Sequence, residues 1–122
     1  MTLGETLTRF DLLYPNSMEL PLKTALISRL EGRLVAEIFS LYEDPPAFTP
    51  YDAALDRDVE LLAPFPFDDL YIKYLCAEND LICGDTDRYR NSAAVFNNSY
   101  DAFAAYYNRT RRVKKQVRLQ AE

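Results

Sequence analysis

The pattern that most constrains the fold lies in the C-terminal third of the chain. Between residues 89 and 107, apolar side chains recur in steps of four, three, four, three and four, at Tyr89, Ala93, Phe96, Tyr100, Phe103 and Tyr107. This spacing places all six on one face of an α-helix. Asp85 stands just before them, where its side chain can cap the first turn. We therefore predict a long helix from Asp85 to about Arg111.

Two further helices are predicted in the first third of the chain. The first covers residues 3–13, with apolar positions at Leu3, Leu7, Phe10 and Tyr14. The second runs from about residue 17 to about residue 42, with a stripe of Leu22, Leu26, Leu30, Leu34, Ile38 and Leu41. Either Asn16 or Ser17 is expected to cap it. Gly32 weakens the helix interior, so it indicates a close crossing with another helix.

A third helix is predicted between two end signals. Asp68 or Asp69 is expected to be its N-cap, and Gly84 is the residue that ends it. Only Gly84 and Asp85 separate it from the long C-terminal helix. A connection this short makes the two helices antiparallel neighbours or joins them at a sharp corner.

Residues 43–67 interrupt the helical pattern. They hold five of the seven prolines, and a connection this long usually signals function or disorder. Residues 59–62 can form a short extended piece, and Pro64-Phe65-Pro66 is expected to be extended. The large apolar groups of this loop indicate that it packs against something. The expected fold class is mainly α: a small bundle of three to four helices, with a long proline-rich loop that can hold short β segments, and an extended C-terminal tail.

Charge is distributed unevenly along the chain. The formal net charge is −5, yet residues 109–122 carry +5, so the remaining residues carry −10. We expect a helical domain over residues 1–112 and a basic arm over residues 113–122. The arm is either a disordered end or a segment that orders on a partner. Docking onto an acidic neighbouring subunit is favoured, because the same chain supplies both charges.

The residues of the chain do not suggest catalytic chemistry. There is no histidine, which removes the usual general base and any mixed Cys/His zinc site. The acidic loop residues Asp52, Asp56, Asp58 and Glu60 lack the glycine and closing glutamate of a calcium loop. Cys76 and Cys83 are seven residues apart, roughly 10 Å along a helix, so we expect two buried, unbridged thiols. We expect no enzyme activity, no cofactor and no metal.

No membrane segment or signal peptide is evident in the sequence. No apolar run approaches the ~20 residues that span a bilayer. The N-terminus also lacks the basic-then-apolar layout of a signal peptide. The sequence thus predicts a soluble protein that is made in the cytoplasm.

Tyrosines are abundant, with nine in 122 residues. Tyr106 and Tyr107 are adjacent, so they cannot share one helix face and at least one ring should reach the surface. Tyrosine is favoured at interfaces, because its large rigid ring ends in a hydrogen-bonding group. The alternative is that the exposed ring is an ordinary amphipathic surface residue.

Five segments of the chain are distinctive: residues 60–75 (ELLAPFPFDDLYIKYL), 87–92 (DRYRNS) and 96–109 (FNNSYDAFAAYYNR), together with 14–17 (YPNS) and 30–37 (LEGRLVAE). These segments resemble a family of tailed-phage and prophage head-to-tail connector, or adaptor, proteins. The resemblance covers about residues 14–109. Phe67 stands where such proteins often have tyrosine, and the tail after Arg109 has no counterpart.

The resemblance implies a structural role in the virion neck, between head and tail. Such proteins form a ring, often of twelve copies, beneath the portal protein. The ring extends the channel through which genomic DNA passes without specific binding, and it docks the next neck or tail protein. The alternative is a small helical regulatory or nucleic-acid-binding module that uses the basic tail.

The sequence also predicts which residues contact neighbouring subunits or partners. The proline-rich loop and the basic tail are the segments best suited to hold a neighbour or the portal. The candidate contact residues are Pro64, Phe65, Pro66, Phe67, Tyr106, Arg109, Arg111, Arg112, Lys114, Lys115 and Arg118.

Overall fold

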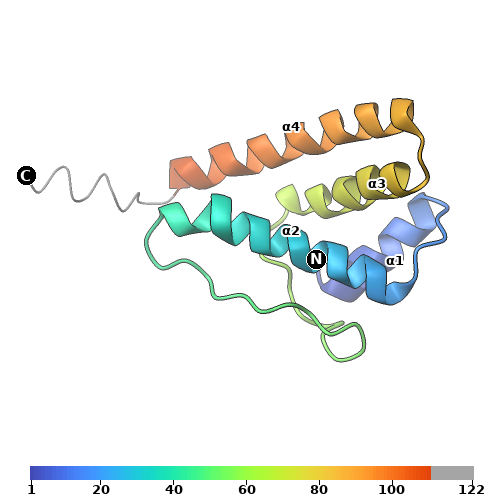
Figure 1. Cartoon of the computed structure of the whole chain (residues 1–122). Helices are drawn as coiled ribbons and strands as arrows, with labels where there is room; N and C mark the ends of the chain where they lie inside the picture. Colours follow the sequence, from blue (N-terminus) through green and yellow to red (C-terminus); the bar gives the residue numbers. More distant parts are fainter. Residues whose placement is uncertain (111–122) are drawn as a thin grey trace, which may run out of the picture.

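Four α-helices form most of residues 1–110, the part of the chain that this computed structural model describes (Figure 1). They are α1 (Leu3–Leu13), α2 (Leu20–Glu37), α3 (Leu70–Ile82) and α4 (Thr86–Thr110), with 3₁₀ turns at Phe39–Leu41 and Phe67–Asp69. Within these residues the extended piece at 59–62 contributes a single antiparallel bridge, between Thr2 and Glu60. The prediction of a mainly helical bundle is therefore confirmed.

α3 and α4 form an antiparallel hairpin. Gly84 has φ of 75°, the left-handed conformation that ends a helix at glycine with least strain. Asp85 caps α4 as predicted, because its side chain accepts the backbone N–H of Arg88 at 3.1 Å. The aromatic face of α4 enters the core at its last four positions: Phe96, Tyr100, Phe103 and Tyr107 are buried. The first two positions, Tyr89 and Ala93, are half-buried.

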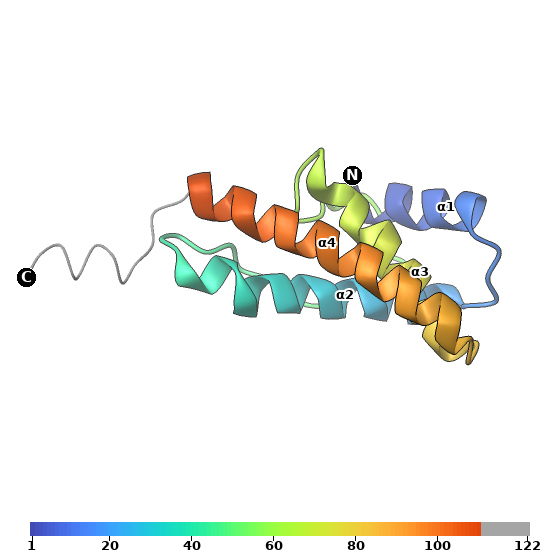
Figure 2. The same ribbon diagram turned by 90° about the horizontal axis from the view of Figure 1, so that it is seen from above.

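α3 lies at the centre of the bundle. α1 and α2 both lie below it in Figure 1 and also contact each other, and α4 lies over the top (Figure 2). α2 reaches α4 through its C-terminal half, where the Arg33 guanidinium stands 4.4 Å from the ring centroid of Tyr100. Tyr100 also donates its hydroxyl hydrogen to Glu37 at 2.5 Å. These contacts close the bundle around the buried aromatic face of α4.

The start of α2 differs from the prediction. The helix begins at Leu20 with Glu19 as its N-cap residue, and Glu19 makes no side-chain capping bond. Asn16 does not cap the helix, because its side-chain oxygen accepts the N–H of Met18 in a tight turn before the helix. Ser17 is exposed and lies three residues before the helix starts. Proline at position 21 fixes the first turn without a side-chain cap.

The two ends of the α2 stripe and its glycine also differ from the prediction. Leu22, in the first turn of α2, and Leu41 are both exposed. Leu41 leaves the stripe because the α-helix ends at Glu37 and the 3₁₀ turn that follows changes the direction of the chain. Gly32 does not mark a helix crossing, since a Cβ atom added there would meet no atom within 4 Å.

The entry into α3 corrects two further predictions. Pro64-Phe65-Pro66 forms a turn rather than an extended segment, and the Phe67 N–H donates to the Pro64 carbonyl at 2.8 Å. Neither Asp68 nor Asp69 caps α3 with its side chain. Instead, Asp68 is buried beside the chain's N-terminal amino group, and Asp69 pairs with Lys73 at 2.9 Å. The preceding 3₁₀ turn leads directly into α3, so no capping side chain is used.

Candidate subunit interface

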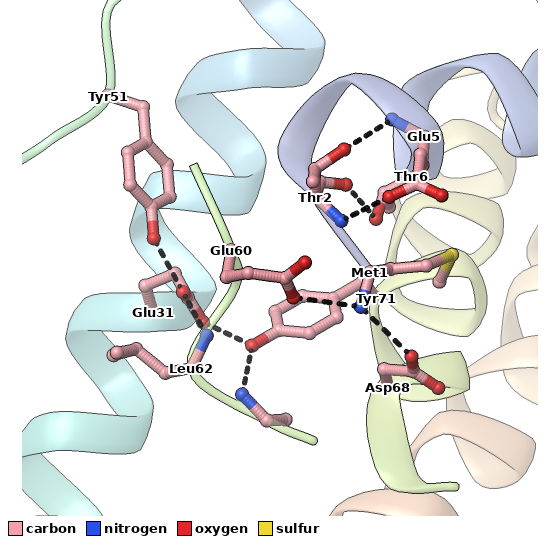
Figure 3. A network of polar contacts seen from close by, with 11 residues as sticks. Met1, Thr2, Glu5, Thr6, Glu31, Tyr51, Glu60, Leu62, Asp68 and Tyr71 are labelled. Carbon is pink, nitrogen blue, oxygen red and sulfur yellow. Dashed lines mark hydrogen bonds and ion pairs between the residues drawn. The ribbon is translucent and has the colours of Figure 1, made fainter. Parts of the chain in front are cut away.

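A buried carboxylate fixes the long loop to the bundle. Glu31 on α2 is fully buried, and it accepts hydrogen bonds from the hydroxyls of Tyr71 at 2.5 Å and Tyr51 at 2.8 Å (Figure 3). Leu62 donates its backbone N–H to the same carboxylate at 2.9 Å. The Tyr71 oxygen also accepts the N–H of Ala63 at 2.8 Å. Because Tyr51, Leu62 and Ala63 belong to the loop, this network connects three points of the loop to α2 and α3.

The electrostatics of this network follow from its burial. Burial raises the pKa of Glu31, although the hydrogen bonds from Tyr71, Leu62 and Tyr51 oppose that shift. The pKa values of Tyr51 and Tyr71 are also raised, by burial first and then by the neighbouring carboxylate. Both tyrosines therefore keep their protons and remain donors to Glu31.

The N-terminal residue forms a second anchor for the loop. Its α-amino group pairs with Asp68 at 3.2 Å and with Glu60 at 3.3 Å (Figure 3). Burial alone would lower the pKa of this amino group, but the hydrogen bonds to both carboxylates raise it above its usual value. The first turn of α1 continues the attachment, since the Leu3 N–H donates to the Val59 carbonyl at 2.9 Å. Loop residues 59–68 and the start of α1 therefore form one unit.

The acidic part of the loop is organised as a tight turn. Asp52 accepts the N–H groups of Ala54 and Leu55 at 2.8 and 2.9 Å, and Asp56 accepts the Asp52 N–H at 2.6 Å. These carboxylates thus hold the turn. At its tip the Leu55 side chain is 84% exposed.

α1 presents an uncovered apolar surface, which we call the α1 surface. Leu12 is 82% exposed and Leu13 59% exposed at the end of the helix. Both line an open groove of about 820 Å³ that also includes Met1 and Gly4. Its charged lining has both signs, with Glu5 and Asp58 opposite in charge to Arg9 and Arg57.

α2 presents a second uncovered surface, which we call the α2 surface. It is an open groove of about 640 Å³ between α2 and the loop. Small and proline residues form much of its lining, namely Pro21, Ala25, Pro50 and Ala53. The linings of the two grooves share no residue, so the two surfaces are different patches of the molecule.

A third groove of about 260 Å³ lies within the loop, and we call it the acidic groove. Its lining comprises Ala47, Phe48, Thr49, Tyr51, Asp56, Val59, Glu60 and Leu62. The charged members of this set are both carboxylates, whereas the grooves on the α1 and α2 surfaces each include arginine.

The structure brings part of the predicted contact set together. Phe65 is 85% exposed, and Pro64 and Pro66 on either side of it are also exposed. Phe67 is half-buried and packs against Tyr106 on α4, with 4.6 Å between ring centroids. The two adjacent tyrosines lie on different faces of α4, because Tyr107 is buried and Tyr106 is half-buried. The Tyr106 ring therefore reaches the surface only in part.

The basic members of the predicted set lie at the end of α4 or beyond it. Arg109 is exposed in the last turn of the helix. The remaining predicted contacts are outside the described residues, and they are Arg111, Arg112, Lys114, Lys115 and Arg118.

Sequence reasoning missed the α1 surface and the exposed turn tip. Leu12 falls off the stripe of Leu3, Leu7 and Phe10, and an apolar residue off the buried stripe was the available signal. Leu55 gave no comparable signal, because its exposure depends on the turn that Asp52 and Asp56 build.

Metal and thiol chemistry receive little support from residues 1–110. No cluster of three or more Cys, Asp or Glu side chains in this range is arranged to hold a metal ion. The two cysteines are unbridged as predicted, but they are not buried: Cys76 is half-buried and Cys83 is exposed after the end of α3. Burial raises the pKa of the Cys76 thiol, which makes it less reactive.

In the described part of the chain, every helix is too short or too polar to cross a lipid bilayer. Comparison with known proteins gave no match to this chain, whether among family models, curated proteins or solved structures.

Proposed function

We propose that this protein is a structural subunit of a ring-shaped head-to-tail connector in a tailed-phage particle. The ring sits in the virion neck beneath the portal, extends the DNA channel and docks the next neck or tail protein. The observation that carries this proposal is the pair of uncovered surfaces on α1 and α2, which are two different patches of one small bundle.

Two different surfaces on one subunit are what a head-to-tail ring requires. A head-to-tail contact joins one patch of a subunit to a different patch of the next, and it closes into a ring when the rotation allows. In this chain the α1 surface of one copy would meet the α2 surface of its neighbour. Exposed leucines such as Leu12 and Leu13 would then be removed from water, which gives the contact its free energy.

The charge of the described residues suits a channel for DNA. Residues 1–110 carry a formal net charge of −9. An acidic wall repels the phosphate backbone, so DNA can pass without being held. The similarity of residues 14–109 to phage connector proteins supports the same role.

The deciding measurement is the molar mass of this protein, or of its oligomer, in solution. Light scattering on a sizing column, at low and high protein concentration and with or without the portal and neighbouring virion proteins, should give a large closed oligomer alone or on a partner. A monomer that ignores every virion protein would contradict the proposal. A DNA titration then tests the alternative, because a nucleic-acid-binding module would bind duplex DNA with sequence preference at moderate salt.

A further inference from the structure

We infer that residues 111–122 of one copy bind in the acidic groove of a neighbouring copy. This inference rests on the proposed function, because it requires copies of the chain to assemble. It names a second contact between them, in a groove that borders the α2 surface at Tyr51. Residues 111–122 lie outside the described part of the chain.

The acidic groove is already ordered by contacts within a single chain. Tyr51 in its wall is held at both ends, since its N–H donates to Ser28 at 3.0 Å and its hydroxyl donates to Glu31 at 2.8 Å. Phe48 packs edge-on against the Tyr51 ring, with 5.1 Å between centroids. Leu62 is fixed by its own hydrogen bond to Glu31. A surface that is already ordered loses little conformational entropy on binding, which favours a specific contact.

The lining of the groove specifies the chemistry of its occupant. Phe48, Val59 and Leu62 supply apolar surface, and the Val59 side chain is exposed. The charged residues of the lining are Asp56 and Glu60, and the Glu60 side chain is 72% exposed. The fitting occupant is therefore an extended segment that alternates apolar and cationic side chains.

The chain contains one segment with this composition. Residues 111–122 read RRVKKQVRLQAE, in which Val113, Val117 and Leu119 are interspersed with five Lys or Arg. The segment carries a net charge of +4, against −9 for residues 1–110. The two parts are thus complementary in charge and in apolar pattern.

The position of α4 favours the groove of a neighbour over the groove of the same chain. In Figure 1, α4 ends at the far left of the bundle, whereas the loop turn that borders the groove lies at the lower right. α4 therefore runs away from its own groove. Twelve residues in an extended conformation would reach at most about 40 Å from the end of α4.

Cross-linking with isotope-labelled subunits tests the contact directly. Full-length chains grown with ordinary and with heavy nitrogen would be mixed, assembled and separated by size. The oligomer would be treated with a carbodiimide, which joins lysine amines to carboxylates, and analysed by peptide mass spectrometry. We expect links from Lys114 or Lys115 to Asp56 or Glu60, with light–heavy pairs as frequent as pairs of one isotope.

The outcomes separate this inference from the proposed function. An oligomer whose tail links join peptides of one isotope alone would show that the tail binds its own chain, and the inference would fail. An oligomer whose tail lysines link only to carboxylates outside the groove would also overturn it. In both cases the ring itself stands. If sizing gives only monomers, with or without virion partners, the proposed function fails first.

A charge exchange gives an independent test. Lys115→Glu and Glu60→Lys, each alone in the full-length chain, should raise the concentration needed for half-assembly by roughly three- to tenfold, as expected when an ion pair becomes a repulsion. The double variant should recover most of that loss. Asp101→Lys is the matched control, because Asp101 is exposed on α4 and lines none of the three grooves. Failure of the double variant to recover assembly, when each single variant still unfolds cooperatively, would overturn the inference.

Discussion

Glu31 determines how the loop is held, although it is a single side chain. Tyr71 donates to one carboxylate oxygen, while Tyr51 and Leu62 donate to the other. A carboxylate is suited to this position, because both of its oxygens accept hydrogen bonds. Any residue with fewer acceptors leaves a buried donor without a partner.

Glu31→Gln should therefore destabilise the fold. The amide group replaces one acceptor oxygen with a donor, so at least one hydrogen bond is lost and the free energy of unfolding falls by about 1–3 kcal/mol. Urea denaturation at pH 7 measures this difference. Glu43→Gln is the control, because Glu43 is exposed and should change stability by less than about 0.5 kcal/mol. Equal stability of the two variants would contradict the role given to Glu31.

The same residue predicts a dependence on pH. The raised pKa of Glu31 means that the folded protein takes up this proton more readily than the unfolded chain. As pH falls from neutral through that raised pKa toward the ordinary value of about 4.3, Glu31 adds stability. Gln does not titrate, so the stability advantage of the natural protein over Glu31→Gln should grow between pH 7 and pH 5. Urea midpoints of both proteins at several pH values measure this advantage. An advantage that shrinks toward pH 5 would show that folding lowers the pKa of Glu31 instead of raising it.

At the scale of elements, two glycines in similar surroundings have opposite roles. An added Cβ would meet no atom within 4 Å at Gly32 or at Gly84. They differ in backbone conformation, because Gly84 has φ of +75° and Gly32 lies inside α2. Gly84 is thus required by the corner between α3 and α4, whereas Gly32 only weakens its helix.

The same substitution should then have opposite effects at the two sites. Gly84→Ala should lower the free energy of unfolding by about 1 kcal/mol, since alanine is strained in the left-handed region. Gly32→Ala should raise it by about 0.5–1 kcal/mol through better helix propensity. Thermal or urea unfolding of both variants checks the signs, and each serves as the other's control. Destabilisation by Gly32→Ala would show that α2 needs a glycine there.

Local signals in the sequence predict the helices well and the anchors poorly. The bounds of α1, the capping of α4 by Asp85 and the corner at Gly84 follow from residues close in sequence. The role of Asp68 could not be predicted in this way, because its partner is the amino group of a residue 67 positions earlier. Glu31 did leave a signal, since it shares a helix face with the buried Ile27 and Leu34.

At the scale of the whole molecule, we expect stability and assembly to depend on different residues. The core is closed by the aromatic face of α4 and by the Glu31 network, while Leu12 and Leu13 remain exposed. Exposed leucines such as Leu12 and Leu13 contribute little to the stability of a single chain. They provide the apolar area that a subunit contact can bury.

Replacing both exposed leucines should separate these roles. Leu12→Ser with Leu13→Ser should weaken self-association by at least about tenfold, because burying one leucine is worth about 1.5–3 kcal/mol. Monomer stability should change by less than about 0.5 kcal/mol per site. Val95→Ser on α4 is the control, since Val95 is exposed but belongs to neither the α1 nor the α2 surface. Sedimentation velocity measures association, and equal weakening by the control would reject the α1 surface as a contact.

The attachment of the N-terminus to loop residues 59–68 has a consequence for synthesis on the ribosome. α1 is made before α2, α3 and α4, yet the groups that bind its first residues, Val59, Glu60 and Asp68, are made about 60 residues later. At about 5–20 residues per second, this delay is roughly 3–12 s. During that interval α1 emerges with both its core face and its exposed leucines uncovered. The nascent chain is therefore most open to chaperones, and to premature association, before residue 68 has left the ribosome.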